Sequence, residues 1–440
     1  MKFGIGVKLA VVGGLALLLM IPVAMLRGLV HERQQRAFEV REEIAQSSSR
    51  AQWISGPMLL LVTEFEHEEV RRVTEDGVQR EVTQRRMERQ GRLVLPETLE
   101  LTAHLDTERR GRSLFSALLI HAGLEVGAGF RMPELPDGHS PVRVSLVLGL
   151  GDSRGLRELS LEADGRALRP EPGTGVNWLG QGVHFPLSLD VLRQDRMQVR
   201  GRLALSGTES VHVLPVGGET RVRITGAWPH PGFVGDSLPI APTVGPDGFE
   251  AEWRVNRLAS QAQQAVQRCG VSAQHCGDAT GAAFGVRLVE PVDRYLMTDR
   301  AMKYALLVLV LVFGTVFFIE VLQRRALHPL QYGLTGLALA MFFLLLLSLA
   351  EHIGFGLAYL LASTACVGLI STYLAGVLGS RRDGLVAAGA LGGLYGLLFG
   401  LLQSEDYALL MGSLALFAFL ACLMLATRRV DWSRLGGGTP

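Results

Sequence analysis

Six long apolar runs constrain this chain more than any other feature of its sequence. One run lies near the N-terminus and five follow one another in the last third of the chain, at 9–26, 304–322, 331–350, 353–379, 385–403 and 407–426. A helix needs about 20 apolar residues to cross a hydrocarbon layer about 30 Å thick, and the runs are close to that length. We therefore predict a membrane protein with six transmembrane α-helices, one of them separated from the other five.

The polar segment between the first two runs is long enough to form a domain. We place an N-terminal transmembrane anchor at 1–30, this domain at 31–303, a five-helix transmembrane bundle at 304–427 and a tail at 428–440. The end of the first run offers no small-x-small cleavage site, so we interpret this run as an anchor rather than as a signal peptide.

The charges of the short connections predict the orientation. Arginine pairs follow the second, fourth and sixth runs, whereas the connections at 351–352 and 404–406 contain no Lys or Arg. Short loops rich in Lys and Arg stay in the cytoplasm. We therefore expect both termini in the cytoplasm and the domain at 31–303 on the outer side of the membrane.

The domain at 31–303 has the pattern of a β-sandwich. Apolar and polar residues alternate in many short stretches, for example at 99–105, and turn signals separate these stretches. This pattern is typical of antiparallel sandwiches, so we predict a mainly-β domain inserted after the first transmembrane helix. We expect the first helix to continue to the serines at 47–49, and a short helix at 254–267. The domain has either two lobes, divided near 131–141, or unusually extended sheets.

Two cysteines lie in the predicted outer domain. Cys269 and Cys276 are close enough in sequence to form a disulfide in an oxidising compartment. A zinc site would need two further ligands, and His275 is the one neighbouring candidate. We predict the disulfide and no metal.

Motifs for enzymatic chemistry are missing from the sequence. It has no nucleotide-binding Gly-rich loop, no His-Glu-x-x-His and no Gly-x-Ser-x-Gly, so we predict that the protein is not an enzyme and uses no cofactor. The formal net charge is +1, which predicts no nucleic-acid partner.

Several segments distributed over the chain resemble one known family. They lie at 228–235, 248–253, 290–295, 328–332, 347–355, 405–410 and 427–432. Together they resemble the CreD family of inner-membrane proteins from Gram-negative bacteria. The resemblance implies an inner-membrane location with the large domain in the periplasm, and a role in cell-envelope integrity and envelope stress. It implies no defined molecular activity. The two cysteines and the glycines at 436–438 are not features of that family.

The segment at 228–235 is the first candidate site. It is rich in Pro and Gly and contains Trp228 and His230. It is either a rigid recognition loop or a structural crossover between strands, and we favour the crossover. His230 has no Asp, Cys or second His nearby at ligand spacing, which argues against a catalytic or metal-binding role.

The outward ends of the membrane helices form the second candidate site. Glu351 and His352 lie at one predicted outward connection, and Glu405 and Asp406 at the other. These residues either form an acidic, protonatable vestibule beneath the domain or serve as helix caps and interface charges. We favour the structural interpretation, which suits Glu405 and Asp406 best because they precede a predicted helix.

Three weaker patterns concern partners. The arginines at 109–112 either contact anionic lipid headgroups or are simply solvated. Glu320 is expected to pair with the arginines at 324–325. The glycines between 389 and 400 have small-xxx-small spacing, which lets a helix approach another helix of the same bundle or the same helix in a homodimer.

Three functional classes fit these observations. The first is a non-enzymatic envelope protein whose outer domain binds a lipid, a glycolipid or a peptidoglycan-related ligand while the bundle contacts membrane lipids. The second is a transporter or a lipid- or glycolipid-handling protein, and the third is a membrane-embedded enzyme. The first is favoured because enzyme motifs are missing and the middles of most predicted spans carry few polar residues.

Overall fold

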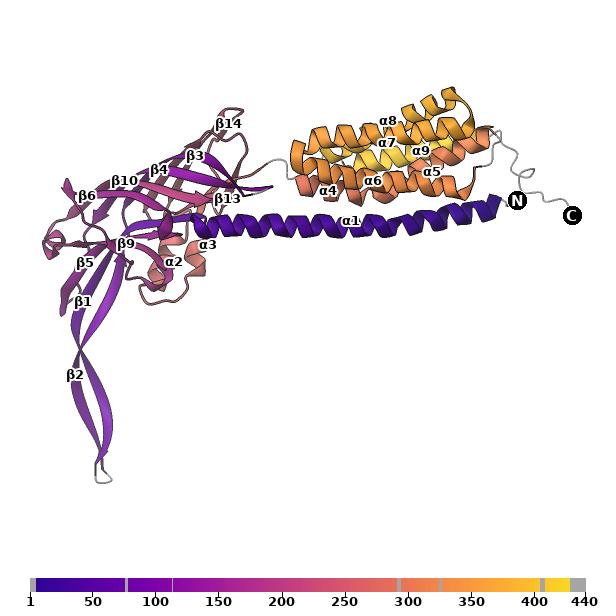
Figure 1. The fold of residues 1–440 in the computed structure, drawn as a ribbon. Coiled ribbons are helices and arrows are strands. Elements are labelled where there is room, and N and C mark those ends of the chain that lie inside the picture. Colours follow the sequence, from indigo (N-terminus) through magenta and orange to yellow (C-terminus); the bar gives the residue numbers. More distant parts are fainter. Residues whose placement is uncertain are drawn as a thin grey trace. The chain divides into compact units, whose positions relative to one another are not determined.

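The computed structural model describes residues 5–75, 78–112, 114–290, 294–323, 327–403 and 408–427. The chain divides into two compact units, one formed by Met1–Phe38 with Val292–Pro440 and the other by Glu39–Pro291. Helix α1 (Ile5–Ser47) is continuous and belongs to both units (Figure 1). It ends at Ser47, which confirms that the first apolar run continues as a helix to the serine cluster.

The first unit is helical. Beside the first part of α1 it contains α4 (Arg294–Lys303), α5 (Ala305–Gln323), α6 (Pro329–Ile353), α7 (Phe355–Leu378), α8 (Arg381–Gln403) and α9 (Ala408–Thr427). The helices α5 to α9 coincide with the five predicted runs to within a few residues.

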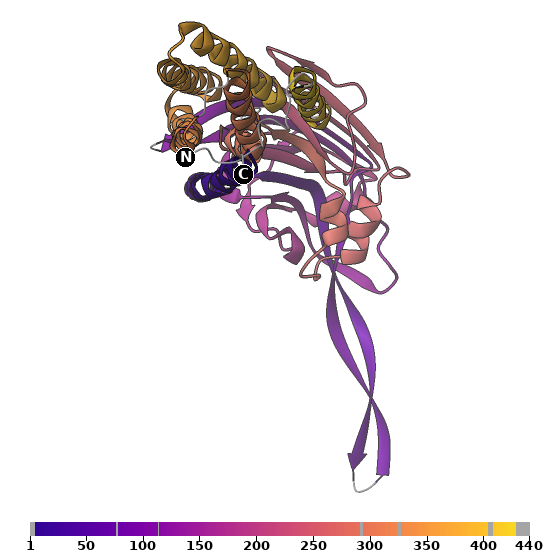
Figure 2. The same cartoon turned by 90° about the vertical axis from the view of Figure 1, so that its right-hand side faces the viewer.

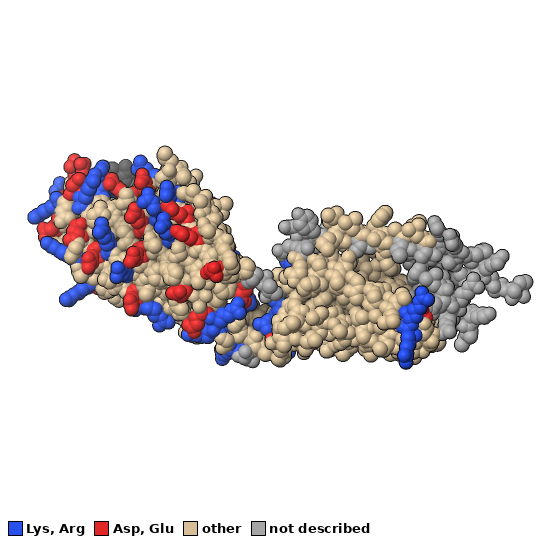
Figure 3. All heavy atoms as spheres, turned by 90° about the horizontal axis from the view of Figure 1, so that it is seen from above, with Lys and Arg blue, Asp and Glu red and all other residues tan. Residues whose placement is uncertain are grey.

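Four of the described helices, namely the stretch Ala10–Ser47, α6, α7 and α8, are long and apolar enough to cross a membrane. Helix α4 and the stretch Ala305–Phe317 of α5, which meet at 49°, pass the same test as a pair. In the view of Figure 3 charged side chains are interspersed over the β-rich unit and are sparse on the helical unit. The structure thus confirms a membrane protein with a β-rich domain after its first helix, and the count of six spans stays a prediction.

The glycine face of α8 is only partly used for packing. Gly384 lies against α7, where a Cβ would come within 2.5 Å of the Ala375 side chain. Gly389, Gly392, Gly393 and Gly396 are exposed, and a Cβ at any of them would meet nothing within 4 Å among the described residues. The structure therefore does not show these four glycines packed on another described helix, and homodimerisation through them stays a prediction.

The second unit is a sandwich of two sheets, each of eight strands. Sheet A has the order β13-β16-β11-β1-β5-β9-β8, with β2 paired to β1. Its strands are β13 (Pro231–Gly235), β16 (Phe284–Leu288), β11 (Ser210–Leu214), β1 (Gln52–Glu75), β5 (His139–Leu150), β9 (Gln181–Leu187), β8 (Glu171–Pro172) and β2 (Val78–Val94).

Sheet B has the order β14-β15-β12-β3-β4-β10-β6-β7. Its strands are β14 (Thr243–Gly245), β15 (Gly248–Asn256), β12 (Glu219–Gly226), β3 (Thr98–Arg112), β4 (Phe115–Arg131), β10 (Arg196–Thr208), β6 (Leu156–Ala163) and β7 (Arg166–Ala167). Both sheets are mixed, because β1 runs parallel to β11 and β3 runs parallel to β12. The expectation of purely antiparallel pairing was wrong in these two places.

One hydrophobic core joins the two sheets. Leu101 and Phe130, before the suggested division at 131–141, belong to the same buried cluster as Leu146, Trp253 and Phe284. The indole of Trp253 stacks on the Phe284 ring with 5.4 Å between the ring centres. The domain is therefore a single sandwich with extended sheets rather than two lobes.

The predicted helix at 254–267 begins later than expected. Arg254 still belongs to β15, where it faces Arg221 of β12. Asn256 then ends the strand, because its side-chain oxygen accepts hydrogen bonds from the backbone N–H groups of Leu258 and Ala259. Helix α2 spans Ala262–Cys269 and is followed by the short α3 (Gly277–Gly281).

Buried hydrogen bonds join the end of α1 to both sheets. The Ser49 hydroxyl donates to the Ser206 carbonyl of β10 at 2.6 Å, and Nε2 of Gln52 on β1 donates to the same carbonyl at 2.8 Å. Nε2 of Gln52 also lies 3.1 Å from the Asp152 carbonyl, which follows β5. All four residues are buried, so this junction fixes the helix end to sheet A and sheet B together.

Asp152 is the ionisable member of this junction. Its carboxylate, 2% exposed, pairs with the Arg154 guanidinium at 2.6 Å. It also accepts hydrogen bonds from the backbone N–H groups of Arg50 and Arg154, each at 3.1 Å. The hydrogen bond from Arg154 holds the pKa of Asp152 below its usual range, against the opposite effect of burial.

We expect Asp152→Asn to lower the free energy of unfolding of the domain at pH 7 by about 2 kcal/mol, because it removes an ionised hydrogen-bond acceptor. The folded-state pKa is lowered, so the carboxylate contributes fully above its unfolded-state pKa of about 4 and loses this contribution as the pH falls through the folded-state value. Denaturant unfolding at pH 7 and pH 3 measures the difference, with Glu162→Gln as the exposed control. An equal difference at both pH values would contradict the prediction.

Candidate functional site

Glu351, near the end of α6, lies in a cluster formed by α1, α4 and α6. Its side chain is 9% exposed. The Tyr295 hydroxyl donates to Oε1 of Glu351 at 3.1 Å, and Nε of Arg33 lies 3.8 Å from the same oxygen. The Arg294 guanidinium donates to the backbone carbonyl of Glu351 at 2.8 Å.

The position of Glu351, near the C-terminal end of α6, is unfavourable for a negative charge. The C-terminal end of a helix carries partial negative charge and leaves its last carbonyl groups without partners inside the helix. A carboxylate there is disfavoured unless cations are near. Arg33 supplies charge to the Glu351 carboxylate, and Arg294 satisfies one of the carbonyl groups. Glu351 is therefore neither a helix cap nor freely solvated.

A second acidic residue extends the cluster between α1 and α4. Oδ1 of Asp299 accepts a hydrogen bond from Nε of Arg27 at 3.0 Å, and its Oδ2 lies 3.0 Å from Nζ of Lys303. Asp299 and Glu351 thus both pair α1 arginines. We call Arg27, Arg33, Arg294, Tyr295, Asp299, Lys303 and Glu351 the charged cluster.

The other proposed vestibule residues are placed differently. His352 is exposed, and its Nδ1 lies 3.0 Å from the carbonyl of Ser348 in the preceding turn. Glu405 and Asp406 lie outside the described residues. The structure therefore brings Glu351 together with Tyr295, Arg33 and Arg294, which the sequence analysis did not connect to it.

Glu320 has a partner inside the bundle. The Tyr332 hydroxyl of α6 donates to Oε2 of Glu320 at 2.8 Å, and both residues are buried. The arginines at 324–325, with which Glu320 was expected to pair, lie outside the described residues.

Trp228 is built into the sandwich. Its side chain is buried, and its Nε1 donates to the Val289 carbonyl at 3.1 Å. The Arg109 guanidinium lies over its ring, 5.9 Å from the ring centre, and pairs with Glu290 at 3.8 Å. His230 is exposed, and its carbonyl accepts from the Val289 N–H at 3.3 Å. These contacts favour a structural crossover, and a recognition role for the segment stays a prediction.

The arginines at 109–112 have acidic partners. Besides the Arg109–Glu290 pair, Arg110 lies 3.2 Å from Glu108, and Arg112 lies 2.7 Å from Glu43 in the last part of α1. Surface ion pairs of this kind contribute little to stability. They do reduce the positive charge that the arginines at 109–112 can offer to a lipid headgroup.

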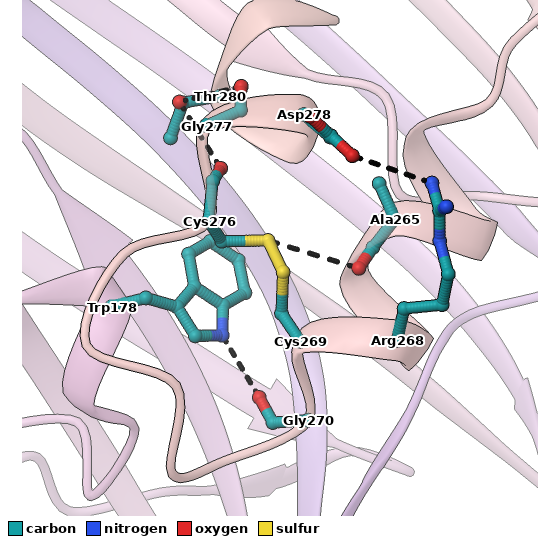
Figure 4. The surroundings of a disulfide bond; sticks show 9 residues. All are labelled: Trp178, Ala265, Arg268, Cys269, Gly270, Cys276, Gly277, Asp278 and Thr280. Atoms are coloured by element: carbon teal, nitrogen blue, oxygen red, sulfur yellow. Dashed lines mark hydrogen bonds and ion pairs between the residues drawn. A yellow bond between two sulfur atoms is a disulfide. The ribbon is translucent and has the colours of Figure 1, made fainter.

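The two cysteines of the sandwich unit form the predicted disulfide. The sulfur atoms of Cys269 and Cys276 are bonded, with Cα atoms 5.9 Å apart (Figure 4). Within the described part of the chain, no group of three or more His, Cys, Asp or Glu could hold a metal ion.

The β1–β2 hairpin is the feature that the sequence analysis missed most completely. Strand β1 pairs with β5 only as far as Phe65, whereas its pairing with β2 continues to Glu75 and Val78. At about 3.3 Å per residue, the ten residues beyond Phe65 form a ribbon about 33 Å long. Figures 1 and 2 show this two-stranded ribbon projecting from the sandwich, with no other strand beside it. We call residues 66–87 the arm.

Taken together, the apolar helices and the single sandwich inserted after the first of them define an integral membrane protein with a β-rich extramembrane domain. The chain matches the family described as Inner membrane protein CreD over residues 4–433. It is 35% identical to the Inner membrane protein CreD of Escherichia coli (strain K12) over 434 residues, which cover 97% of this chain and 93% of that protein. The chain belongs to the CreD family, and it is an inner-membrane protein of the cell envelope.

The hydrogen bond between Tyr295 and Glu351 should couple α4 to α6. In a double-mutant cycle, Tyr295→Phe and Glu351→Gln should each destabilise the protein, and their effects should be non-additive by about 1 kcal/mol because they remove the same charged hydrogen bond. Thermal unfolding in nanodiscs measures this coupling, with His352→Gln as the neighbouring exposed control. Additive effects would show that the two side chains do not interact in the membrane.

Proposed function

We propose that this protein supports cell-envelope integrity and the response to envelope stress as a non-enzymatic binding protein. In this proposal the sandwich lies in the periplasm and binds an envelope component, and the helical unit holds it at the inner membrane. The observation that carries the proposal is the arm at 66–87. It projects from a domain that already has its own core, and none of the arm side chains that the structure describes belongs to that core.

The arm has the properties of a binding element. An isolated two-stranded ribbon is marginally stable in water, so projection of this length needs a reason other than the stability of the fold. Within the described sheets, β2 pairs with β1 alone, and beyond Phe65 β1 pairs with β2 alone. Both outer edges of the arm therefore offer backbone groups to a partner.

Charges on the arm limit unwanted pairing. Arg85 lies 3.0 Å from Glu68 and 3.7 Å from Glu66 across the two strands. Arg89 and Glu64 form a similar pair at 3.1 Å nearer the sandwich. Charged side chains on exposed edges discourage aggregation, so a specific partner would have to complement both signs of charge.

The alternative, a transporter or a lipid- or glycolipid-handling protein, has less support. A polar substrate would need polar groups directed towards a pathway. The Tyr359 hydroxyl instead donates to the Tyr395 carbonyl at 2.7 Å, and the Tyr395 hydroxyl donates to Sγ of Cys366 at 3.2 Å. The thiol of Cys366 lies 3.5 Å from the Ala338 carbonyl. These polar groups pair with each other across α6, α7 and α8.

The proposed orientation predicts which connections face the cytoplasm. The arginines at 381–382 begin α8, whereas the connection at 404–406 carries acids and no Lys or Arg. A reporter fused after Ser380 should show cytoplasmic activity, and one fused after Glu405 should show periplasmic activity. Fusions after Ser47 and after residue 427 serve as the outer and inner controls. Periplasmic activity after Ser380 would exclude this orientation.

Shortening the arm tests its role directly. Deleting 67–74 and 79–86 removes eight residues from each strand and keeps the connection between the strands. It also preserves the alternation of faces, since Glu75 then follows Glu66 and Met87 follows Val78. We expect an unchanged melting temperature, because the arm lies outside the core, and loss of envelope-stress resistance in a complemented deletion strain. Glu162→Gln, a change of an exposed side chain on β6 outside the arm, is the control and should complement fully.

Full complementation by the shortened protein, at an expression level matched to wild type, would exclude the arm as the binding element.

A further inference from the structure

A pocket of about 280 Å³ lies on sheet A, at its edge with the segment that carries the disulfide. Trp53 and Ser55 of β1 line it from one side, on the face of the strand opposite to Ile54. Trp178 and Gln181 line it from another side, and Thr280 of α3 completes the rim. Neither the arm nor the charged cluster contributes to this pocket.

Two glycines let the groups that line the pocket approach one another closely. Gly149 and Gly151 of the β5 edge both line it. A Cβ at Gly151 would lie 3.2 Å from Cδ1 of Trp53, and a Cβ at Gly149 would lie 2.8 Å from Cδ2 of Leu179. A Cβ at Gly151 would also lie 2.7 Å from the Ala51 carbonyl oxygen, so a side chain at either position would push apart the groups that line the pocket.

The tryptophan on the sheet is held by a neighbour. The His212 ring stacks on one face of the Trp53 indole, with 4.4 Å between the ring centres and 14° between the planes. Burial, and then the charge of Arg287, lower the pKa of His212, so the ring is neutral at pH 7 and suited to stacking. Gly151 also lines the pocket, and its lack of a side chain lets it lie close to the backbone and the ring of Trp53.

The other tryptophan is held by the disulfide segment. Nε1 of Trp178 donates to the Gly270 carbonyl at 2.9 Å, directly after Cys269 (Figure 4). The neighbouring Asn177 donates through its N–H to the Val271 carbonyl at 3.0 Å and through Nδ2 to the Ser272 carbonyl at 3.2 Å. The Cys269–Cys276 bond closes the loop that carries these three carbonyl groups. Three hydrogen bonds and one covalent bond therefore fix the roof of the pocket.

The polar groups of the pocket are neutral. None of its ten lining residues is charged. Oε1 of Gln181 accepts from the N–H and the hydroxyl of Ser153 at 2.8 and 3.1 Å, which orients the amide and leaves its Nε2 available as a donor within the described chain. The Ser55 hydroxyl is a second group without a hydrogen bond to the described residues. This chemistry disfavours phosphates, nucleotides and free amino acids.

We propose that this pocket binds the ring of a neutral or N-acetylated sugar. Flat indole faces pack against the C–H faces of a pyranose ring, and the amide of Gln181 and the hydroxyl of Ser55 match its hydroxyl groups. The volume is at the lower end for ligand pockets and admits one ring rather than a long chain. The inference goes beyond the proposed function, because it assigns a second binding site, for an envelope glycan, on the sandwich itself.

Sugar binding is measured on the full-length protein in lipid nanodiscs, prepared without glycosidic detergents that would occupy the pocket. The probes are the trisaccharide of N-acetylglucosamine and maltotriose, followed by saturation-transfer NMR and by tryptophan fluorescence. We expect saturable binding of at least one probe. Gln181→Leu, a change of an exposed side chain, should weaken it about tenfold or more, and Trp53→Ala should abolish it.

Two comparisons separate a direct role from misfolding. Phe233→Ala, which removes an equally half-buried aromatic ring from the other side of sheet A, should leave sugar affinity unchanged. Cys269→Ser with Cys276→Ser should weaken binding, because the roof loses its covalent closure, whereas alkylation should find no free thiols at these positions in untreated wild type. Thermal unfolding of each variant shows whether the fold is retained.

The absence of saturable binding by both probes, or equal binding by wild type and Gln181→Leu, would overturn the proposal. Competition by nanodiscs containing lipopolysaccharide would assign the sugar to a glycolipid, and its absence would assign it to a glycan strand; both results support a sugar site. The arm deletion tests the proposed function separately, because it leaves the pocket residues intact.

Discussion

The junction at the end of α1 is the constraint on which the rest of the domain depends. A helix that leaves the membrane must end somewhere, and its last carbonyl groups then need partners. Here the chain passes from Ser47 into β1 within a few residues, and Ser49, Gln52 and Asp152 connect this short passage to β10 and to the end of β5. Displacement of residues 49–52 would break buried hydrogen bonds to both sheets at once.

The same junction explains why two neighbouring positions are occupied by glycine. A Cβ at Gly155 would lie 2.1 Å from the Ser206 carbonyl oxygen, and a Cβ at Gly207 would lie 2.8 Å from Cγ of Gln52. The backbone segments approach so closely because Ser206 receives hydrogen bonds from two side chains. Packing and hydrogen bonding therefore require each other here, and together they hold the segment that follows Ser47 against both sheets.

The sequence predicted those features that depend on local pattern. Apolar runs of membrane-spanning length gave the helices α5 to α9 closely, since length and composition are properties of a single segment. The alternation at 99–105 likewise matches the buried and exposed residues of β3. The parallel pairing of β1 with β11 was not predictable, because it depends on which distant strands meet. The arm was missed because charged and polar residues dominate its sequence and its valines, at 70, 73, 78 and 82, do not recur at every second residue, so the usual strand pattern is absent.

The contacts that build the candidate sites could not be predicted for a related reason. The sequence identified Glu351 as an acidic residue at an outward helix end. Its partner Arg33 lies hundreds of residues away in the chain and Tyr295 lies tens of residues away, and no spacing rule connects them. The pocket on sheet A combines Trp53 with Trp178 and a loop closed by Cys269 and Cys276. Pairing of the two cysteines was predictable from their compartment and spacing, whereas the hydrogen bond from Trp178 to the Gly270 carbonyl was not.

Asp152 and Glu351 are both largely buried carboxylates that pair with arginine, but they lie at opposite ends of their helices. Asp152 precedes a short 3-10 helix, Ser153–Gly155, and accepts a hydrogen bond from the backbone N–H of Arg154. Its negative charge therefore suits the N-terminal end of this helix, and a structural role accounts for it. Glu351 lies at the opposite end of a helix, where its charge opposes the backbone dipole and depends on Arg33 and Tyr295. A neutral residue there would avoid this cost. The local backbone alone therefore accounts for the charge of Asp152, whereas the charge of Glu351 depends on partners from α1 and α4.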